Sequence, residues 1–245
     1  MKKIIYTIIS AILILTLSIS VCACGAANSP VLSAAPAETG EDNTQTPEAS
    51  KGENTVYFSS MGEKFEVFNT KDELTKASSN IIAGKCVSAK SAFKEHGFMY
   101  TVCEVEVTQC FKGNLTPGSA VKVVEFGGTC PASEFIKESG IEEKDFYDES
   151  AAQTNPDLTV TTGIDGYYPM SEGQDVLLFL GESGTYDGIE DVYGVMGSSD
   201  GKLYKISDTT YARPLPEATA GYSKAYSLQS CLNNTDLKID ISELK

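Results

Sequence analysis

Two long stretches in which apolar and polar residues alternate dominate the first half of the chain. They cover 80–93 and 98–111, and a short polar segment separates them. One face of the second stretch is mainly apolar: Met99, Cys103, Val105, Val107 and Phe111. The opposite face is polar, and a period of two residues is typical of a strand with one buried and one solvated side. The pattern predicts a long β-hairpin, with Gly97 in the turn.

Three further segments have the pattern of strands or of a hairpin. Residues 120–126 predict a third strand, and the unbroken apolar run 175–180 predicts a strand buried on both faces. Asp200-Gly201, between 192–198 and 202–206, has the sequence of a two-residue hairpin turn.

Helical patterns are fewer. Thr70 and Glu73 have the spacing of a capping box, which predicts a short helix over 70–77. Residues 222–232 predict a C-terminal helix with one apolar side.

The segment 131–173 differs from the strands around it. Its first part is rich in acidic residues with helically spaced apolar ones, and we expect one or two short helices there. Residues 155–173 have the composition of a long irregular loop. Three strands, a helical insert at 131–173 and two or three more strands give a mainly β protein. This order matches a five-stranded Greek-key barrel of OB type, with the helical insert between strands three and four and short peripheral helices. We expect 55–245 to form this one domain.

The N-terminus has the features of an export signal. Lys2 and Lys3 precede a stretch without charge, from 4 to 21. The sequence Val21-Cys22-Ala23-Cys24-Gly25 resembles the lipobox of bacterial lipoproteins. The resemblance implies acylation of Cys24, cleavage after Ala23 and therefore a signal peptide over 1–23. Two acyl chains give stable anchoring where one does not. The alternatives are an uncleaved signal anchor and an ordinary cleaved leader.

Residues 24–54 contain almost no large apolar side chains and are rich in Ala, Pro, Ser, Thr and acidic residues. Such a composition buries too little surface to offset the entropy of an ordered chain. We expect a disordered tether that spans about 30 Å on average. It would hold the domain off the outer face of the cell membrane.

A family resemblance covers 80–206. It rests on these segments: Ile81-Ile82-Ala83-Gly84-Lys85, Tyr100–Val107, Phe111-Lys112-Gly113, Gly118–Gly128 and Gly173–Leu180. They resemble a group of uncharacterised Firmicute surface lipoproteins, whose domain is similar to the OB-like barrel of tissue inhibitors of metalloproteinases. In those inhibitors a free N-terminal cysteine chelates the zinc of the protease. Here the corresponding cysteine is expected to carry lipid, so inhibition does not follow from the resemblance.

Charge and composition exclude several functions. The net charge is −15, which disfavours binding to nucleic acids or to anionic lipid surfaces. The one histidine, His96, falls in the predicted hairpin turn, and there is no Cys-x-x-Cys pair. Neither a metal site, a cofactor nor a catalytic constellation is indicated.

Five cysteines follow Cys24, an odd number that leaves at least one unpaired. Cys86 and Cys103 lie on adjacent predicted strands, where they either meet across the hairpin or, as we favour, remain buried free thiols. We expect Cys130 to be the most exposed cysteine, and it is a candidate binding residue.

Tyr167 and Tyr168, beside the predicted loop, are the other candidate binding residues, although tyrosines there also suit the plug of a barrel end. We therefore expect a membrane-anchored, non-catalytic and monomeric binding module for an unknown protein or small ligand. The alternatives are an extracytoplasmic enzyme and a protease-inhibitor-like protein.

Overall fold

The computed structural model describes residues 54–62, 66–94, 97–140, 155–216, 221–223 and 226–244. Of these, 49% lie in strands and 16% in helices, so the prediction of a mainly β protein is confirmed. The predicted signal peptide, the tether with Cys24 and the predicted turn residue His96 lie outside these ranges. No helix among the described residues is long and apolar enough to cross a membrane.

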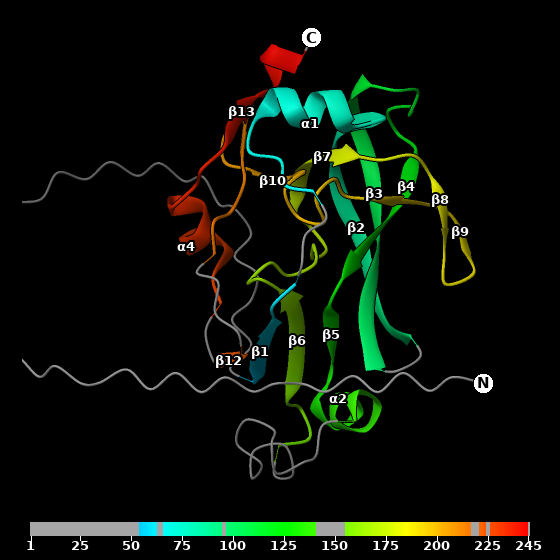
Figure 1. The fold of residues 1–245 in the computed structure, drawn as a ribbon, viewed down its shortest axis with the longest axis vertical. Coiled ribbons are helices and arrows are strands. Elements are labelled where there is room, and N and C mark those ends of the chain that lie inside the picture. Colours follow the sequence, from blue (N-terminus) through cyan, green and yellow to red (C-terminus); the bar gives the residue numbers. More distant parts are fainter. Residues whose placement is uncertain are drawn as a thin grey trace, which may run out of the picture. The chain divides into compact units, whose positions relative to one another are not determined.

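The larger of the two sheets contains the predicted strands (Figure 1). Its members, from edge to edge, are β13 (Lys238–Asp240), β11 (Thr210–Ala212), β10 (Lys202–Lys205), β7 (Asp175–Leu180), β2 (Asn80–Lys94), β3 (Phe98–Lys112), β4 (Ala120–Phe126), β9 (Ile189–Gly194) and β8 (Gly184–Tyr186). β2 and β3 pair along their whole length, which confirms the predicted hairpin. β4 and β7 have the bounds that the sequence predicts.

All neighbouring strands of this sheet are antiparallel except β4 and β9, which are parallel. Beyond β9 the chain returns to β7. Gly181 N donates to Gly194 O (3.1 Å), and Met196 N donates to Phe179 O (2.9 Å). These bonds connect the end of β9 to the end of β7, although the described strands do not form a closed barrel.

A second sheet lies outside the predicted pattern. Its order is β12 (Gly221–Ser223), β1 (Thr55–Ser60), β6 (Thr159–Ile164) and β5 (Gly128–Pro131), with β1 and β6 parallel. β6 falls inside 155–173, so the prediction of an irregular loop there is wrong. The helical insert 131–173 is likewise incomplete, because it contains this strand besides a helix. The β-branched run at 159–162 favours a strand, but its partner β1 is about a hundred residues away in the sequence.

The helices are short. α1 (Lys71–Ala77) has the predicted capping box: Glu73 N donates to Thr70 Oγ1 (3.3 Å), and Thr70 N donates to Glu73 Oε2 (3.1 Å). α2 (Ala132–Ser139) is the predicted helix of the insert. α4 (Leu228–Asn233) begins later than predicted, because 221–223 pair with β1 as a strand. The 3-10 turn η3 (Ile241–Leu244) follows β13.

The predicted hairpin at Asp200-Gly201 is wrong. β9 and β10 do not pair with each other, and the positive φ angles occur at Gly197 (60°) and Ser198 (62°). Asp200 is instead buried, and its carboxylate accepts a hydrogen bond from Phe68 N (2.9 Å). Its side chain holds a distant segment, which a local turn pattern does not reveal.

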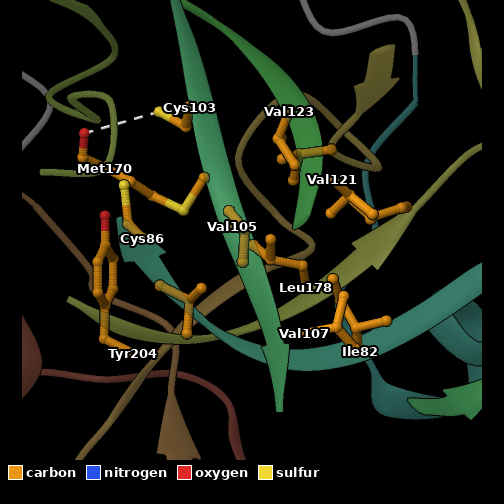
Figure 2. Close-up of a cluster of buried hydrophobic side chains, with 13 residues drawn as sticks. Ile82, Cys86, Cys103, Val105, Val107, Val121, Val123, Met170, Leu178 and Tyr204 are labelled. Carbon is orange, nitrogen blue, oxygen red and sulfur yellow. Dashed lines mark hydrogen bonds between the residues drawn. The ribbon is translucent and has the colours of Figure 1, made fainter. Parts of the chain in front are cut away.

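The interior of the curled strands β2, β3, β4 and β7 holds the main apolar cluster (Figure 2). Its buried members are Ile82, Cys86, Cys103, Val105, Val107, Val121, Val123, Met170, Val176, Leu178, Leu180, Val195 and Tyr204. Cys103, Val105 and Val107 of β3 thus face this cluster as the alternation predicts. Met99 belongs instead to a second apolar cluster, and Phe111 packs against a third. Val176–Leu180 are all fully buried, which confirms that β7 has no solvated face.

Candidate functional site

Four aromatic rings form a row on the outer side of the large sheet. Tyr100 contacts Tyr186 at 5.1 Å between ring centroids, Tyr186 contacts Phe126 at 6.5 Å, and Phe126 contacts Phe98 at 5.9 Å. Each pair is edge-to-face, the geometry that aromatic quadrupoles favour. Phe98 is 54% exposed and Phe126 is 43% exposed. We call these four residues the aromatic surface.

Strand register and one tight turn assemble this surface. Tyr100 lies opposite Phe126 in the β3–β4 pair, so both rings project from the same face. The turn between β8 and β9 has positive φ at Asp187 and Gly188. It places Tyr186 against Tyr100, whose hydroxyl donates to Asp187 Oδ2 (2.8 Å). This hydrogen bond, together with burial, raises the pKa of Tyr100, which stays neutral at physiological pH.

A shallow groove of about 250 Å³ adjoins the aromatic surface on the outer face of β2, β3 and β4. Its lining includes Ser88, Lys90, Tyr100, Glu104, Lys122 and Ile189. At its side, Lys94 Nζ lies 4.8 Å from the centre of the Tyr186 ring, a cation–π contact. The groove offers stacking faces, hydroxyls and charges of both signs.

The two predicted tyrosines lie in separate environments. Tyr168 packs edge-to-face with Tyr57 (5.3 Å) and Tyr226 (4.5 Å). Burial raises the pKa of Tyr168 to about 12. Burial also raises the pKa of Tyr167 to about 12, against the opposing effect of the Arg213 guanidinium. The structure therefore does not bring Tyr167 and Tyr168 together as one surface, and Tyr168 takes part in a half-buried aromatic cluster.

Cys130 is buried, so the prediction that it is the most exposed cysteine is wrong. It is 8% exposed and belongs to a second apolar cluster that includes Val56, Phe135 and Val160. Burial raises the pKa of Cys130 to about 12, so the thiol stays protonated at neutral pH. The prediction failed because it lacked the second sheet: Cys130 lies opposite Val160 of β6 and packs with Val56 of β1 and Phe135 of α2.

A buried ion pair is the feature that sequence reasoning missed. Glu125 of β4 and Lys202 of β10 form a salt bridge, with side chains 4% and 2% exposed. Met170 N also donates to Glu125 Oε2 (2.8 Å), and Lys202 Nζ donates to the carbonyl of Tyr168 (2.8 Å). The pair thereby holds segment 168–170 on the interior strands. A signal was present, because Glu125 continues the inward-facing series Val121, Val123 of β4.

The ion pair joins β4, β10 and segment 168–170, and we call these two side chains the structural clip. Among the residues that the structure describes, every buried side-chain nitrogen and oxygen has a hydrogen-bond partner. Within the same residues, no group of three or more His, Cys, Asp or Glu side chains is placed to hold a metal ion.

No model of a protein family matches the chain, and no curated protein matches it significantly.

Proposed function

We propose that this protein is a lipoprotein on the outer face of the cell membrane and acts as a monomeric, non-catalytic binding module. Its lipid-bearing residue is Cys24, after a signal peptide over 1–23, and the tether 24–54 carries the domain. The proposal is supported by the sequence Val21-Cys22-Ala23-Cys24-Gly25 and by the uncharged stretch before it.

We further propose that β2, β3, β4, β7 and β9 are the five strands of an OB-like Greek-key barrel, similar to that of tissue inhibitors of metalloproteinases. Three features support this. β2, β3 and β4 form an antiparallel meander, β9 runs parallel to β4, and β7 pairs with β2. Two hydrogen bonds between 179–181 and 194–196 also link the end of β7 to the end of β9, although the barrel is not closed by a continuous ladder. The additional strands and the second sheet extend this arrangement.

The binding surface that the geometry favours is the aromatic surface with its groove. OB folds bind ligands on the face of their second and third strands and on the loops that follow the first and fourth. The corresponding elements here are β3, β4, the β2–β3 turn and the connection that contains β8. The single observation that carries the proposal is the pair of exposed rings, Phe98 and Phe126, at the end of an ordered aromatic row. Solvent-exposed aromatic side chains fixed in this way are typical anchors of binding interfaces.

The binding surface is tested by photo-cross-linking in cells. A photoreactive phenylalanine analogue replaces Phe126 in the full-length protein, and the matched control places it at Ile206, which is 41% exposed against 43% for Phe126. We expect a cross-linked species of higher mass only from position 126. Equal cross-linking from positions 126 and 206 would refute the placement of the surface. It would also be refuted if the analogue gave no cross-link at position 126 and none when placed at Phe98.

The anchor is tested by labelled fatty acid. We expect Cys24→Ala to abolish incorporation and Cys22→Ala to retain it. Incorporation of labelled fatty acid into Cys24→Ala would contradict the proposed anchor. The proposal about the binding surface would not be affected by that result.

The alternative of an enzyme that uses Cys130 receives no support from the burial of that thiol. For a protease inhibitor, the zinc-chelating cysteine would be the residue that we propose to be acylated.

A further inference from the structure

Two of the buried thiols lie next to each other inside the curled sheet. Cys86 belongs to β2 and Cys103 to β3, and neither has any exposed surface. Figure 2 shows both at the same end of the main apolar cluster, beside Met170 and Tyr204. Both cysteines therefore face the interior from adjacent strands.

A β-bulge sets their relative position. Cys86 lies opposite Val105 and Ala89 lies opposite Cys103, with a register shift between Cys86 and Ser88. The shift inserts one extra residue into β2, so that Cys86 and Ala89 project from the same face of the strand although they are three residues apart; Cys86 is buried and Ala89 is exposed. Cys86 and Cys103 thus become diagonal neighbours on that face.

The two thiol groups affect each other's titration. The Cys103 thiol lowers the pKa of Cys86, whereas the Cys86 thiol and burial together raise the pKa of Cys103. Cys103 Sγ also lies 3.7 Å from Glu125 Oε2 and 3.8 Å from the carbonyl oxygen of Met170. The buried polar contacts fix the Cys103 side chain with its sulfur beside that of Cys86.

The other three cysteines have different surroundings. Cys130 lies in the second apolar cluster, and Cys110 and Cys231 are partly exposed. Cys110 is seven residues from Cys103 on the same strand, about 23 Å away, so these two cannot bridge.

We propose that Cys86 and Cys103 are joined by a disulfide in the exported protein. The inference rests on the proposed extracytoplasmic location, because disulfides persist in oxidising compartments. The oxidant belongs to the class of disulfide donors, such as an extracytoplasmic thiol–disulfide oxidoreductase. The Cys86 thiolate, having lost its proton to solvent, attacks the donor disulfide and releases one thiolate. Cys103, deprotonated in turn, attacks Cys86 Sγ and releases the second, so that two electrons pass from the two cysteines to the donor.

The burial of both sulfurs determines when this step occurs. Exchange needs access to the sulfur atoms, so the bridge forms during folding, before segment 168–170 packs over them. The bridge encloses residues 87–102, which carry Lys94, Phe98 and Tyr100. It therefore fixes the register between β2 and β3, the two strands that line the groove together with β4.

The decisive test is refolding of the full-length protein in detergent with oxidised glutathione as the disulfide donor. After blocking of free thiols and digestion with trypsin, we expect the peptide 86–90 linked to the peptide 95–112. Its mass is that of the two reduced peptides together, less two hydrogen atoms and with the blocking group on Cys110. Because 95–112 also contains Cys110, Cys110→Ser is the control that retains the link and Cys103→Ser the variant that loses it. We expect the bridged protein to melt higher than its reduced form by about 5 °C or more. A refolded protein without the linked pair, or with a link that Cys110→Ser abolishes, overturns the inference.

A second arm separates this inference from the proposed function. Cells are treated with a thiol-blocking reagent before lysis, and the same peptides are analysed. A bridge in both arms supports the disulfide and the oxidising location. A bridge after refolding with free thiols in cells supports the pairing of the two cysteines and contradicts their oxidation in cells. The labelling of Cys24 with fatty acid decides the extracytoplasmic anchor separately.

Discussion

Replacement of Lys202 by Met tests whether the buried ion pair is a structural clip. The change removes the cation beside Glu125, whose side chain is only 4% exposed, and leaves that buried carboxyl group without its partner. Removing one partner of a buried pair costs about 3–5 kcal/mol, because the remaining charge is neither solvated nor compensated. The carbonyl of Tyr168 also loses its donor. For a domain of this size we expect the melting temperature to fall by about 6–20 °C.

The matched background is Glu125→Gln. Its amide oxygen still accepts the hydrogen bond from Met170 N, but no buried carboxylate remains when Lys202 is replaced. The double variant should therefore cost less than the two single variants together, by at least about 1.5 kcal/mol. The free energy of unfolding is measured by urea titration, followed by circular dichroism and by tyrosine fluorescence, since the chain has no Trp. A cost below about 1 kcal/mol for Lys202→Met, or strict additivity in the cycle, would refute the clip.

Three further predictions concern the backbone and the ion pair between Arg213, which is buried, and Asp236, whose side chain is 40% exposed. Gly127→Ala should destabilise the protein more than Gly118→Ala, by at least about 1 kcal/mol in urea titrations. Both glycines have positive φ, but a Cβ added at Gly127 would collide with the backbone oxygen of Thr162, whereas one added at Gly118 would meet nothing within 4 Å. Equal costs would contradict the close approach of β6 at this turn. Arg213→Lys should lower the free energy of unfolding by about 1–3 kcal/mol. The buried guanidinium donates hydrogen bonds from Nε and Nη2 to the two Asp236 oxygens (2.9 and 2.5 Å), and an ammonium group cannot make this pair of bonds. An unchanged urea midpoint would contradict this role of the guanidinium. The hydrogen bonds from Arg213 lower the pKa of Asp236, so its contribution is present above the ordinary carboxyl pKa and is lost as the pH falls through the lowered one. Asp236→Asn should therefore flatten the loss of stability below about pH 4, and an unaltered acid profile would exclude this role.

The parts of the fold that the sequence predicts are those with local signals. The hairpin of β2 and β3 follows from an alternation that continues over many residues, and the capping box of α1 from two residues three apart. β7 follows from an apolar run too short for a helix. In each case the residues that determine the element lie within it.

The second sheet could not be predicted in the same way. β1 and β6 pair in parallel over a long sequence separation, and neither strand shows a regular alternation of its own. The run Val56-Tyr57-Phe58 at the start of the domain was a usable signal for a strand, but it does not identify the partner. The wrong prediction that Cys130 is exposed follows from missing this sheet, because the cluster that buries Cys130 includes Val56 of β1 and Val160 of β6.

The candidate site was missed for a related reason. Phe98, Tyr100 and Phe126 fall on the solvated faces of predicted strands, where single aromatic residues attract no attention. They form a surface only because Tyr186 arrives from a turn about sixty residues later than Phe126. Register can be derived once β3 and β4 are paired, but the path of that turn depends on tertiary contacts.

Because residues of β4 alternate between the interior and the groove side, stability and binding can be tested there with separate point variants. Deletion of the segment 131–173 does not allow this separation. Glu125 faces the interior and its neighbour Phe126 faces the groove side, so consecutive positions belong to the buried clip and to the aromatic surface. Deletion of 131–173 would instead remove β6, which is bonded to both β1 and β5, and with it the middle of the second sheet. Loss of binding in such a deletion would reflect loss of structure. Only point variants on the outward positions can therefore assign a ligand to this protein, and unchanged stability of those variants is the condition for interpreting them.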